Sequence, residues 1–501
     1  MKKIVIVGGG TAGLIAASFM NRYWEDNAHI TVICDENNKT IGVGESTTPV
    51  IQLILQVLGI PISELINIDS TIKIGINFKD WIPGKEFFHG FPETILEDVQ
   101  WFPVSNDETS AVYSLLNHKY NGASHFNEPV TKLPSSDPGN MGTIALHIDT
   151  LKFVQLLRDR LKDTDSVEFI DDVVDRVRVN AECDKITNIE LKNNGIIDAD
   201  FYIDASGFNA VLFKHLNPRW NDISKILPID RAIPQQVPNT SGEIPSYTQA
   251  EATDNGWIWQ LPIGNRYGTG YLYSSKFTSD EEAREKYNKW LLKNHNKELE
   301  TDRIIKYRPG YYEDNLIGNC MAVGLAAGFL EPLESTSIGI MGYQVYNFLV
   351  FNGIGNLSYT KRFLNKNNRS IYQEVMRFLT LHYCTNRTDS EFWRYMTNNK
   401  TEWVEDFEEK CNKEFIDASV FDTVRSHAYK FDSYVQIANG LNLFNIESLR
   451  NFLIEKPEGQ AILDSSENLY EQQENIRRQY QWVPHTKVID LHKYSYGSDT
   501  Y

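Results

Sequence analysis

The chain has 501 residues, 41% of them hydrophobic, which is enough to bury a large core and excludes wholesale disorder. Its 49 basic and 67 acidic residues give a formal net charge of −18, so no basic surface for nucleic acid or an anionic membrane is expected. No apolar run reaches the ~18 residues of a membrane-spanning helix, and the five cysteines are scattered, without a C-x-x-C pair. We therefore expect a cytoplasmic protein with reduced cysteines and no metal site.

The N-terminal residues predict a dinucleotide-binding βαβ unit. An apolar strand over residues 4–7 leads into the glycine loop of residues 8–13, and an apolar helix follows over residues 14–20. A second strand, residues 30–33, ends at Asp35-Glu36. This order is the fingerprint that holds the pyrophosphate and ribose of a dinucleotide, with Asp35 our first choice for the ribose acid and Glu36 the second. The predicted cofactor contacts of the loop are Gly8, Gly10, Thr11, Ala12 and Gly13.

The segment after the second strand combines a loop with a helix. Residues 42–48 contain two glycines and three hydroxyl residues, and Pro49 opens an apolar helix over residues 50–58. Such a loop is able to wrap a ring system, although a plain loop with a helix cap is the alternative. Its predicted cofactor contacts are Gly44, Glu45 and Ser46.

Residues 70–81 alternate in hydrophobicity as one continuous strand would. Lys73 falls on the polar face of this strand, where a lysine is usually solvated, so spacing alone gives it no function. Residues 86–145 are rich in aromatic residues, Asn, Ser, Asp and Pro. We expect them to form irregular structure and short strands that cover a site.

The middle of the chain predicts a capped helix over residues 148–157 and strands near residues 167–170 and 201–204. A β-hairpin is expected further on, with a first strand over residues 256–262. Trp257 and Trp259 share one face of that strand by its period of two, and a packed aromatic ladder is their plain interpretation.

Residues 319–337 predict a short buried strand, a run of small residues and the start of a helix. The small residues from Gly324 allow a backbone to approach a planar ligand closely. Free backbone N–H groups at the helix start, after Glu334-Ser335-Thr336-Ser337, attract anions. The alternative is an ordinary joint with a capping Ser or Thr. Beyond residue 345 the chain is expected to be largely helical.

Four of these motifs, in this order, resemble the flavin-dependent halogenases, the group that includes the tryptophan halogenases. They are residues 8–13, Lys73 in Lys-Ile-Gly-Ile-Asn-Phe, the Gly-Trp-Ile-Trp-Gln-Leu-Pro element of residues 256–262, and residues 324–337. The W-x-W-x-[IL]-P element separates this family from related flavin monooxygenases, and Leu261 stands where Ile is usual. The resemblance extends to about residue 396 and fades after about residue 400.

The resemblance implies a two-component FAD enzyme. Reduced FAD from a separate flavin reductase, O2 and a halide ion (chloride, bromide or iodide) give hypohalous acid, which is guided to Lys73 for electrophilic halogenation of an aromatic substrate. Lys73 would either donate a hydrogen bond to that acid or carry the halogen as a haloamine. Glu334 would stabilise the cationic arene and accept its proton.

The same resemblance gives roles to five further positions. Thr336 and Ser337 match the halide site, and many family members have Gly at position 337. Trp257 and Trp259, with Pro262 after them, match the element that keeps substrate apart from the flavin.

The expected architecture is an α/β flavoprotein with a FAD-binding, Rossmann-like fold of the GR2 flavin monooxygenase type. A β-rich substrate cover and a helical C-terminal part complete it. Gly324 and Leu333 are further predicted FAD contacts. The expected segments are 1–85, 146–215 and 301–350 for FAD, 86–145 and 216–300 for the substrate, and 351–501 for the helical part.

Two other functions stay open at this point. An aromatic hydroxylase of the same fold is disfavoured by Lys73 and the tryptophan pair, and a flavin-binding protein without turnover is disfavoured by Lys73 and Glu334. We find no counterpart of the C-terminal aromatic and acidic residues with which tryptophan halogenases hold free tryptophan. The predicted partner is therefore a small arene of the indole or phenol type, and a homo-oligomer is compatible with the sequence.

Overall fold

A computed structural model describes residues 1–36, 42–91, 94–96, 99–101, 132–134, 144–351, 357–413, 429, 431–455, 460 and 482–494. The chain divides into two compact units, each made of three segments. Unit 1 contains residues 1–68, 148–228 and 306–373, and unit 2 contains residues 69–147, 229–305 and 374–501. Most of the region expected to cover the substrate, residues 86–145, lies outside the described residues, so that expectation stays a prediction.

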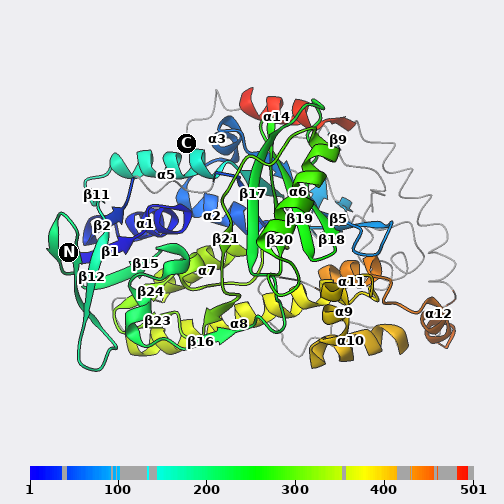
Figure 1. The fold of residues 1–501 in the computed structure, drawn as a ribbon. Helices are drawn as coiled ribbons and strands as arrows, with labels where there is room; N and C mark the ends of the chain where they lie inside the picture. Colours follow the sequence, from blue (N-terminus) through cyan, green and yellow to red (C-terminus); the bar gives the residue numbers. More distant parts are fainter. Residues whose placement is uncertain are drawn as a thin grey trace. The chain divides into compact units, whose positions relative to one another are not determined.

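Unit 1 is built on a six-stranded sheet in the order β11-β2-β1-β15-β24-β23 (Figure 1). The first five strands are parallel, and the short β23 pairs antiparallel with β24 at one edge. The predicted Rossmann-like fold is therefore confirmed, and the apolar runs of its strands are typical of a parallel sheet. The bounds are β1 Lys2–Val7, β2 Ala28–Cys34, β11 Val167–Asp171, β15 Phe201–Asp204, β23 Leu316–Ile317 and β24 Cys320–Ala322.

Helix α1 (Thr11–Trp24) connects β1 to β2 and completes the predicted βαβ unit. It contacts α2 (Val50–Leu58), α5 (Thr150–Lys162) and α7 (Ser337–Val350). Helix α5 is capped as predicted, because Asp149 Oδ1 accepts a hydrogen bond of 3.2 Å from the Lys152 N–H. Two smaller antiparallel sheets of unit 1 are made of β12 Val174–Val179, β13 Ile186–Leu191 and β14 Gly195–Ile197, and of β16 Trp220–Asp222, β22 Gly310–Tyr312 and β25 Gly328–Phe329.

Unit 2 is built on a seven-stranded sheet in the order β21-β17-β20-β19-β18-β5-β6. The predicted hairpin is confirmed as β19 and β20, which pair antiparallel. On one face of this sheet, Ile258 and Tyr271 pack with Tyr287 of helix α6 (Asp280–His295), which Figure 1 shows across the strands. The bounds are β5 Gly75–Lys79, β6 Glu86–Gly90, β17 Arg231–Pro238, β18 Tyr247–Thr253, β19 Gly256–Ile263, β20 Arg266–Tyr273 and β21 Ile305–Lys306.

Residues 70–81 do not form the single strand that their alternation predicts. They form β4 (Thr71–Lys73), which pairs antiparallel with β10 (Ala145–Ile148), and β5, which pairs with β18 and β6. The break falls at Ile74, whose N–H donates to the Ser246 carbonyl at 2.7 Å. The prediction is wrong here because alternation reports the two faces of a strand and not which strands lie beside it.

The predicted helical C-terminal part is confirmed in the described residues. It comprises α8 Leu357–His382, α9 Glu391–Asn398, α10 Glu402–Lys413, α11 Phe431–Gly440, α12 Ile446–Ile454 and α14 His485–Tyr494, with the short strand β26 Trp482–Pro484 before α14. Across the part of the chain that the structure describes, no helix combines the length and apolarity needed to cross a membrane.

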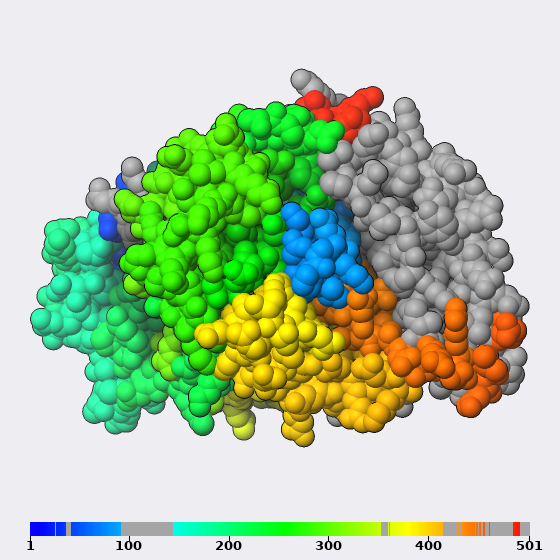
Figure 2. All heavy atoms as spheres, turned by 45° about the vertical axis from the view of Figure 1, so that its right-hand side comes forward, coloured from blue at the N-terminus to red at the C-terminus, as the bar shows by residue number. Residues whose placement is uncertain are grey.

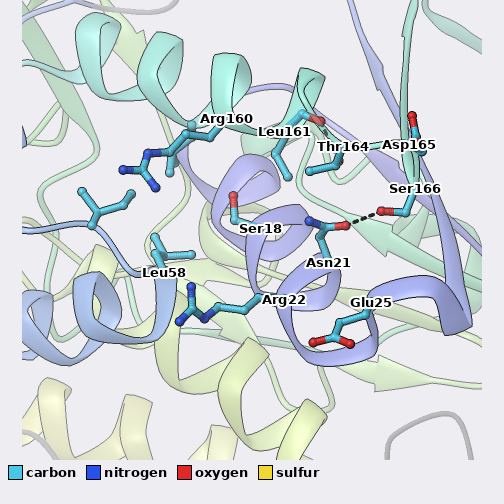
Figure 3. Close-up of a pocket in the computed structure, with 12 residues that line it drawn as sticks. Ser18, Asn21, Arg22, Glu25, Leu58, Arg160, Leu161, Thr164, Asp165 and Ser166 are labelled. Carbon is cyan, nitrogen blue, oxygen red and sulfur yellow. Dashed lines mark hydrogen bonds between the residues drawn. The ribbon is translucent and has the colours of Figure 1, made fainter. Parts of the chain in front are cut away.

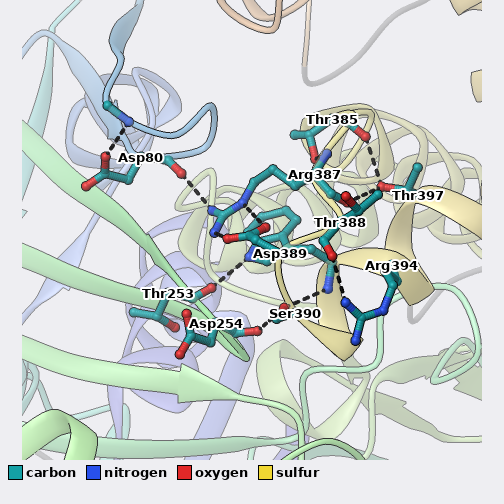
Figure 4. Close-up of polar contacts among 12 residues, drawn as sticks. Asp80, Thr253, Asp254, Thr385, Arg387, Thr388, Asp389, Ser390, Arg394 and Thr397 are labelled. Carbon is teal, nitrogen blue, oxygen red and sulfur yellow. Dashed lines mark hydrogen bonds and ion pairs between the residues drawn. The ribbon is translucent and has the colours of Figure 1, made fainter.

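Arg387 fastens the loop before α9 to the sheet of unit 2 (Figure 4). Its guanidinium donates to both carboxylate oxygens of Asp389, at 3.0 and 2.6 Å, and to the Asp80 carbonyl at 2.7 Å. It also lies 4.3 Å from the ring centroid of Trp393, whose Nε1 donates to the Thr253 carbonyl at 2.8 Å. These contacts hold α9 at the ends of β5 and β18, and the blue segment of β5 and β6 borders the yellow surface of α9 in Figure 2.

All five cysteines are free thiols. Cys34, Cys320, Cys384 and Cys411 are buried. Cys183 is half-buried in the turn between β12 and β13.

Candidate functional site

The glycine loop of unit 1 joins the carboxyl end of β1 to α1. Gly8 has φ +124°, and a Cβ there would lie 2.2 Å from the Ala205 carbonyl oxygen. A Cβ on Gly13 would lie 1.8 Å from the Gly8 carbonyl oxygen, so neither position tolerates a side chain. At Gly10, by contrast, no described atom beyond its chain neighbours lies within 4 Å of such a Cβ. The first and third glycines therefore serve tight packing, and the second leaves open the space that a ligand needs.

Gly324 joins this loop from far along the chain. It has φ +60°, and a Cβ there would lie 2.9 Å from the Cβ of Ala12. The Gly324 N–H donates to Gln344 Oε1 at 3.2 Å, which fixes the turn after β24. The predicted cofactor residues at both places thus lie together at the carboxyl ends of the parallel strands, where ligands bind in sheets of this kind.

Asp204 braces the turn at the end of the intervening strand, β15. Its Oδ1 accepts from the Ser206 N–H at 3.0 Å, and its Oδ2 accepts from the N–H groups of Leu212 and Phe213 at 2.8 Å each. Burial raises the pKa of Asp204, and these hydrogen bonds oppose that effect. Sequence analysis predicted the strand near residues 201–204 and did not single out the carboxylate that shapes the turn after it.

The loop of residues 44–46 comes to the start of α1. Thr11 Oγ1 donates to Glu45 Oε1 at 3.4 Å, which brings two predicted cofactor contacts together. Loss of hydration raises the pKa of Glu45 to about 7, and the hydrogen bond from Thr11 lowers it. Gly44 has φ +87°, and Ser46 ends the two-residue strand β3 (Glu45–Ser46).

Two acids follow β2, as predicted. Glu36 forms an ion pair of 2.6 Å with Arg158, which also contacts Cys34 Sγ at 3.1 Å. The Glu36 N–H donates to Asp171 Oδ1 at 2.9 Å. Because Arg158 engages the Glu36 carboxylate, Asp35 stays our first choice for the ribose acid.

The turn before α7 contains the predicted acid and halide residues. The Ser335 N–H donates to the Pro332 carbonyl at 3.0 Å, and Ser335 has φ +58°. Glu334 is only 2% exposed. Helix α7 begins at Ser337, and its N-cap residue, Thr336, makes no side-chain cap hydrogen bond. The interpretation of this joint as a side-chain-capped helix start is therefore wrong.

Two further residues of this turn are buried. Leu333, predicted to contact FAD, is 1% exposed, and Glu331 is 2% exposed. Sequence reasoning did not single out Glu331, although it stands three residues before Glu334 in the same turn.

A cavity of about 610 Å³ in unit 1 lies elsewhere (Figure 3). Its lining includes Arg22 from the last turns of α1, Arg160 from α5, and Ser166, which precedes β11. Ser166 Oγ donates to Asn21 Oδ1 at 2.5 Å, and Arg160 pairs with Glu64 at 2.7 Å. These groups stand at the amino ends of the strands, opposite the glycine loop, so the cavity is not part of the predicted cofactor site.

Lys73 ends β4 in unit 2, and its side chain is 0% exposed. Its Nζ lies 5.3 Å from the ring centroid of Phe91, and Ala145 of β10 is its cross-strand partner. The interpretation of Lys73 as a solvated lysine is therefore wrong, because other parts of the chain cover the face that spacing marks as polar. Buried, charge-bearing side chains of this kind concentrate at functional sites.

The tryptophan pair shares one face of β19, as predicted. Trp257 is 1% exposed, and its Nε1 has no hydrogen-bond partner among the residues that the structure describes. Trp259 is half-buried and lies flat over Gly270, its cross-strand neighbour, where a Cβ would come within 2.0 Å of the indole Cη2. A buried donor without a partner is unusual for residues that only pack a core.

A chain of hydrogen bonds joins the tryptophan strand to the lysine strand. Thr71 Oγ1 donates to the Pro262 carbonyl at 2.8 Å and therefore accepts from His147 Nδ1 at 3.1 Å. His147 Nε2 is then the acceptor for Thr248 Oγ1 at 2.9 Å. Burial holds the pKa of His147 well below its usual value, with a smaller contribution from Lys73. A lone histidine in a single sequence gave no signal of this contact.

The residues of unit 1 fit a bound FAD. Gly10 leaves room for the pyrophosphate beside the uncapped start of α1, since Gly10 makes no side-chain cap bond there. Gly324 lies beside Ala12, and Asp35 follows β2 where the ribose acid of this fold stands.

Comparison with known proteins identifies the family of this chain. Residues 3–450 match the tryptophan halogenase family, so the expected limit of the resemblance near residue 400 is wrong. Tryptophan 7-halogenase RebH from Lentzea aerocolonigenes is 30% identical over 438 residues, which cover 82% of this chain and 81% of RebH. Tryptophan 6-halogenase SttH from Streptomyces toxytricini is 29% identical over 438 residues, which cover 81% of this chain and 82% of SttH.

Solved structures share the fold. Tar14, a tryptophan C-6 flavin-dependent halogenase from taromycin biosynthesis, superposes with a TM-score of 0.82 at 24% identity, covering 98% of this chain and 100% of Tar14. Xcc4156, a flavin-dependent halogenase from Xanthomonas campestris, gives 0.83 at 22% identity, covering 98% of each chain. The glycine loop, the tryptophan strand and the family match all agree. The chain therefore belongs to the tryptophan halogenase family and is a flavin-dependent halogenase.

Proposed function

We propose that this halogenase uses Lys73 to present hypohalous acid to an electron-rich arene. The observation that carries the proposal is the complete burial of Lys73 at the end of its strand. That strand is joined to the tryptophan strand by hydrogen bonds. Bound FAD, with O2 and a halide ion, supplies the hypohalous acid. As an ammonium, Lys73 would donate to the oxygen of this acid and make the halogen more electrophilic. As an amine, it would carry the halogen covalently.

The reaction consumes an arene and hypohalous acid and yields a haloarene and water. In the hydrogen-bonded form, the ring carbon attacks the halogen, the oxygen–halogen bond breaks, and Lys73 gives a proton to the departing oxygen. Glu334 is the proposed base, because a buried carboxylate stabilises a cationic ring and accepts the proton that the ring loses. A proton returned from Glu334 to Lys73 through solvent closes the cycle.

Unit 1 would hold the halide and the FAD. Thr336 and Ser337 stand at the start of α7, where no side-chain cap competes with an anion for the first N–H groups. Ser337 offers the same N–H as glycine, and its side chain adds bulk, so we expect position 337 to influence the choice among chloride, bromide and iodide.

RebH, SttH and Tar14, named above, are tryptophan halogenases. For this chain we propose a small arene of the indole or phenol type, because electrophilic substitution favours electron-rich rings and no tryptophan-holding motif matches after residue 400. A separate flavin reductase is the proposed source of reduced FAD, since the sequence has one dinucleotide fingerprint. Consumption of NADPH by the purified protein with FAD alone would contradict this partner.

Two substitutions test the proposed roles. Lys73→Met keeps an unbranched, flexible side chain of similar shape and removes the nitrogen, so arene halogenation should collapse while a trapping reagent still detects hypohalous acid. Lys73→Arg is the matched control for a hydrogen bond without a transferable amine. Glu334→Gln should slow the arene step by roughly 10²–10⁴-fold, the usual span for a lost acid–base group.

Mass spectrometry of the product decides the outcome. Robust arene halogenation by Lys73→Met would remove Lys73 from the mechanism. A product that carries hydroxyl in place of halogen would favour the aromatic hydroxylase.

A further inference from the structure

A histidine from the C-terminal segment reaches the strand that carries Lys73. His485 is the first residue of α14, and its side chain is 0% exposed. The N–H of Ile72, the residue before Lys73, donates to His485 Nε2 at 3.2 Å. The other ring nitrogen, Nδ1, lies 3.1 Å from the Ile244 carbonyl oxygen. One imidazole thus joins three segments of unit 2 that lie far apart in the sequence.

The two hydrogen bonds define the form of the imidazole. Nε2 accepts from a backbone N–H, so it carries no proton, and Nδ1 must donate because a carbonyl oxygen only accepts. His485 is therefore the neutral Nδ1–H tautomer. Neither a proton on Nε2 nor the other tautomer satisfies both contacts.

The position of Ile72 in the ladder explains why this contact matters. Ile72 stands opposite Leu146 of β10, between the pairs Thr71–His147 and Lys73–Ala145. In an antiparallel pair the backbone groups of alternate residues turn away from the partner strand. The Ile72 N–H is such a group, and His485 supplies the acceptor that the ladder leaves missing.

Thr71 of the same strand makes a second set of contacts, because its hydroxyl bridges His147 and the Pro262 carbonyl. β4 has only three residues, so the ladder to β10 by itself is short. Side-chain contacts at two successive residues, Thr71 and Ile72, therefore determine much of how firmly the backbone of Lys73 is held.

We infer that His485 is a positioning residue for Lys73, acting through the Ile72 amide to fix the strand from which the lysine projects. The inference rests on the proposed role of Lys73. It assigns a function to residues 482–494, which carry no recognisable motif, and it makes correct placement of the catalytic lysine depend on the docking of α14.

The structural part is testable without turnover. His485→Phe keeps a buried ring and removes both hydrogen bonds, so the Ile72 amide should exchange with deuterium at least about tenfold faster. Exchange is read by mass spectrometry in peptides that cover residues 70–74. His485→Gln restores an acceptor and a donor on one amide and should recover much of the protection. If the phenylalanine variant does not fold, His485→Ala carries the same test.

His382→Phe is the matched control. His382 is also 0% exposed and hydrogen-bonds a carbonyl, that of Phe378 at 2.8 Å. Its loss should lower stability without selective exchange at residues 70–74. Equal protection of the Ile72 amide in wild type and His485→Phe overturns the inference, whatever the activity.

The functional part is read as coupling, the yield of haloarene per hypohalous acid formed. We expect His485→Phe to lower this yield by tenfold or more, to leave hypohalous acid formation near wild type, and to be rescued in part by His485→Gln. Faster exchange with unchanged coupling overturns the positioning role. If Lys73→Met still halogenates the arene, the proposed function fails, and the exchange data still report whether His485 fixes the strand.

Discussion

Thr71 Oγ1 donates a hydrogen bond of 2.8 Å to the carbonyl of Pro262, and this one contact ties the strand of the tryptophan pair to the strand that ends at Lys73. Thr71 is 1% exposed, so neither partner has water as a substitute. Proline suits the acceptor position, since it offers a carbonyl and no N–H. The family signature in β19 and the lysine thus belong to one hydrogen-bonded framework in unit 2.

Thr71→Val should break this framework at little cost in volume. The Pro262 carbonyl and His147 Nδ1 would each lose a partner, which should lower the free energy of unfolding by about 1–3 kcal/mol. Haloarene yield should fall more than hypohalous acid formation. Thr71→Ser keeps the hydroxyl and should retain the wild-type ratio of the two. Equal losses of both activities in the valine variant would speak against a link to Lys73.

Gly270→Ala tests the placement of the Trp259 indole. The new methyl would lie 2.0 Å from Cη2 of Trp259, so the ring must move. We expect a loss of about 1–3 kcal/mol in unfolding free energy, the usual cost of overpacking. We also expect an altered ratio of halogenated to hydroxylated arene in the product. Adding Trp259→Phe should restore stability, which a double-mutant cycle measures. Additive losses in the double variant would show that the two residues do not meet.

FAD binding should weaken as the pH rises through about 7. The pKa of Glu45 is raised to about 7, so this carboxyl becomes ionised above that pH, next to Thr11 at the start of α1. An added negative charge repels the pyrophosphate, and the dissociation constant should rise by up to about tenfold per pH unit. Glu45→Gln should flatten the profile in fluorescence titrations of oxidised FAD. Glu64→Gln, at the Arg160 ion pair, is the control, and a flat wild-type profile would refute the assignment.

Acid should destabilise unit 2 through His147. Its folded-state pKa lies well below 6.5, chiefly because of burial and further because of the nearby charge of Lys73. Below pH ~6.5 the unfolded chain binds a proton that the folded state does not, so the stabilising contribution is complete above that pH and declines as the pH falls. His147→Gln should remove up to ~1.4 kcal/mol per pH unit from the slope of unfolding free energy between pH 6.5 and 5.5. Urea midpoints across that range measure it, and identical slopes would contradict a neutral buried His147.

Local patterns predicted the parts of the fold that depend on neighbours in sequence. The strand, glycine loop and helix at residues 4–20 were predictable because each glycine has a steric reason visible in the motif, as Gly8 and Gly13 show. The β19–β20 hairpin was predictable from its period of two. The resemblance then connected Lys73 with Glu334 and the halide residues, which no local pattern does.

Contacts across long stretches of chain were out of reach. The burial of Lys73 involves β10, more than 70 residues away in sequence. The strand that ends at Lys73 is held by His485, which is 413 residues from Ile72. Polar alternation therefore predicted a solvated face where the fold builds a covered one. His147 and His485 carry no motif, because a hydrogen bond to a backbone or a hydroxyl places no constraint on neighbouring residues.

The burial of the cysteines has a consequence for an enzyme whose own intermediate is a strong oxidant. Thiolates react with hypohalous acid faster than neutral thiols do. Burial raises the pKa of Cys320 well above its usual value and that of Cys384 to about 12, so both stay as neutral thiols. Burial also raises the pKa of Cys34 and of Cys411. Cys183, half-buried in its turn, is left as the thiol that leaked oxidant reaches first, and the sulfinic and sulfonic forms that accumulate there would record how many turnovers escape the arene.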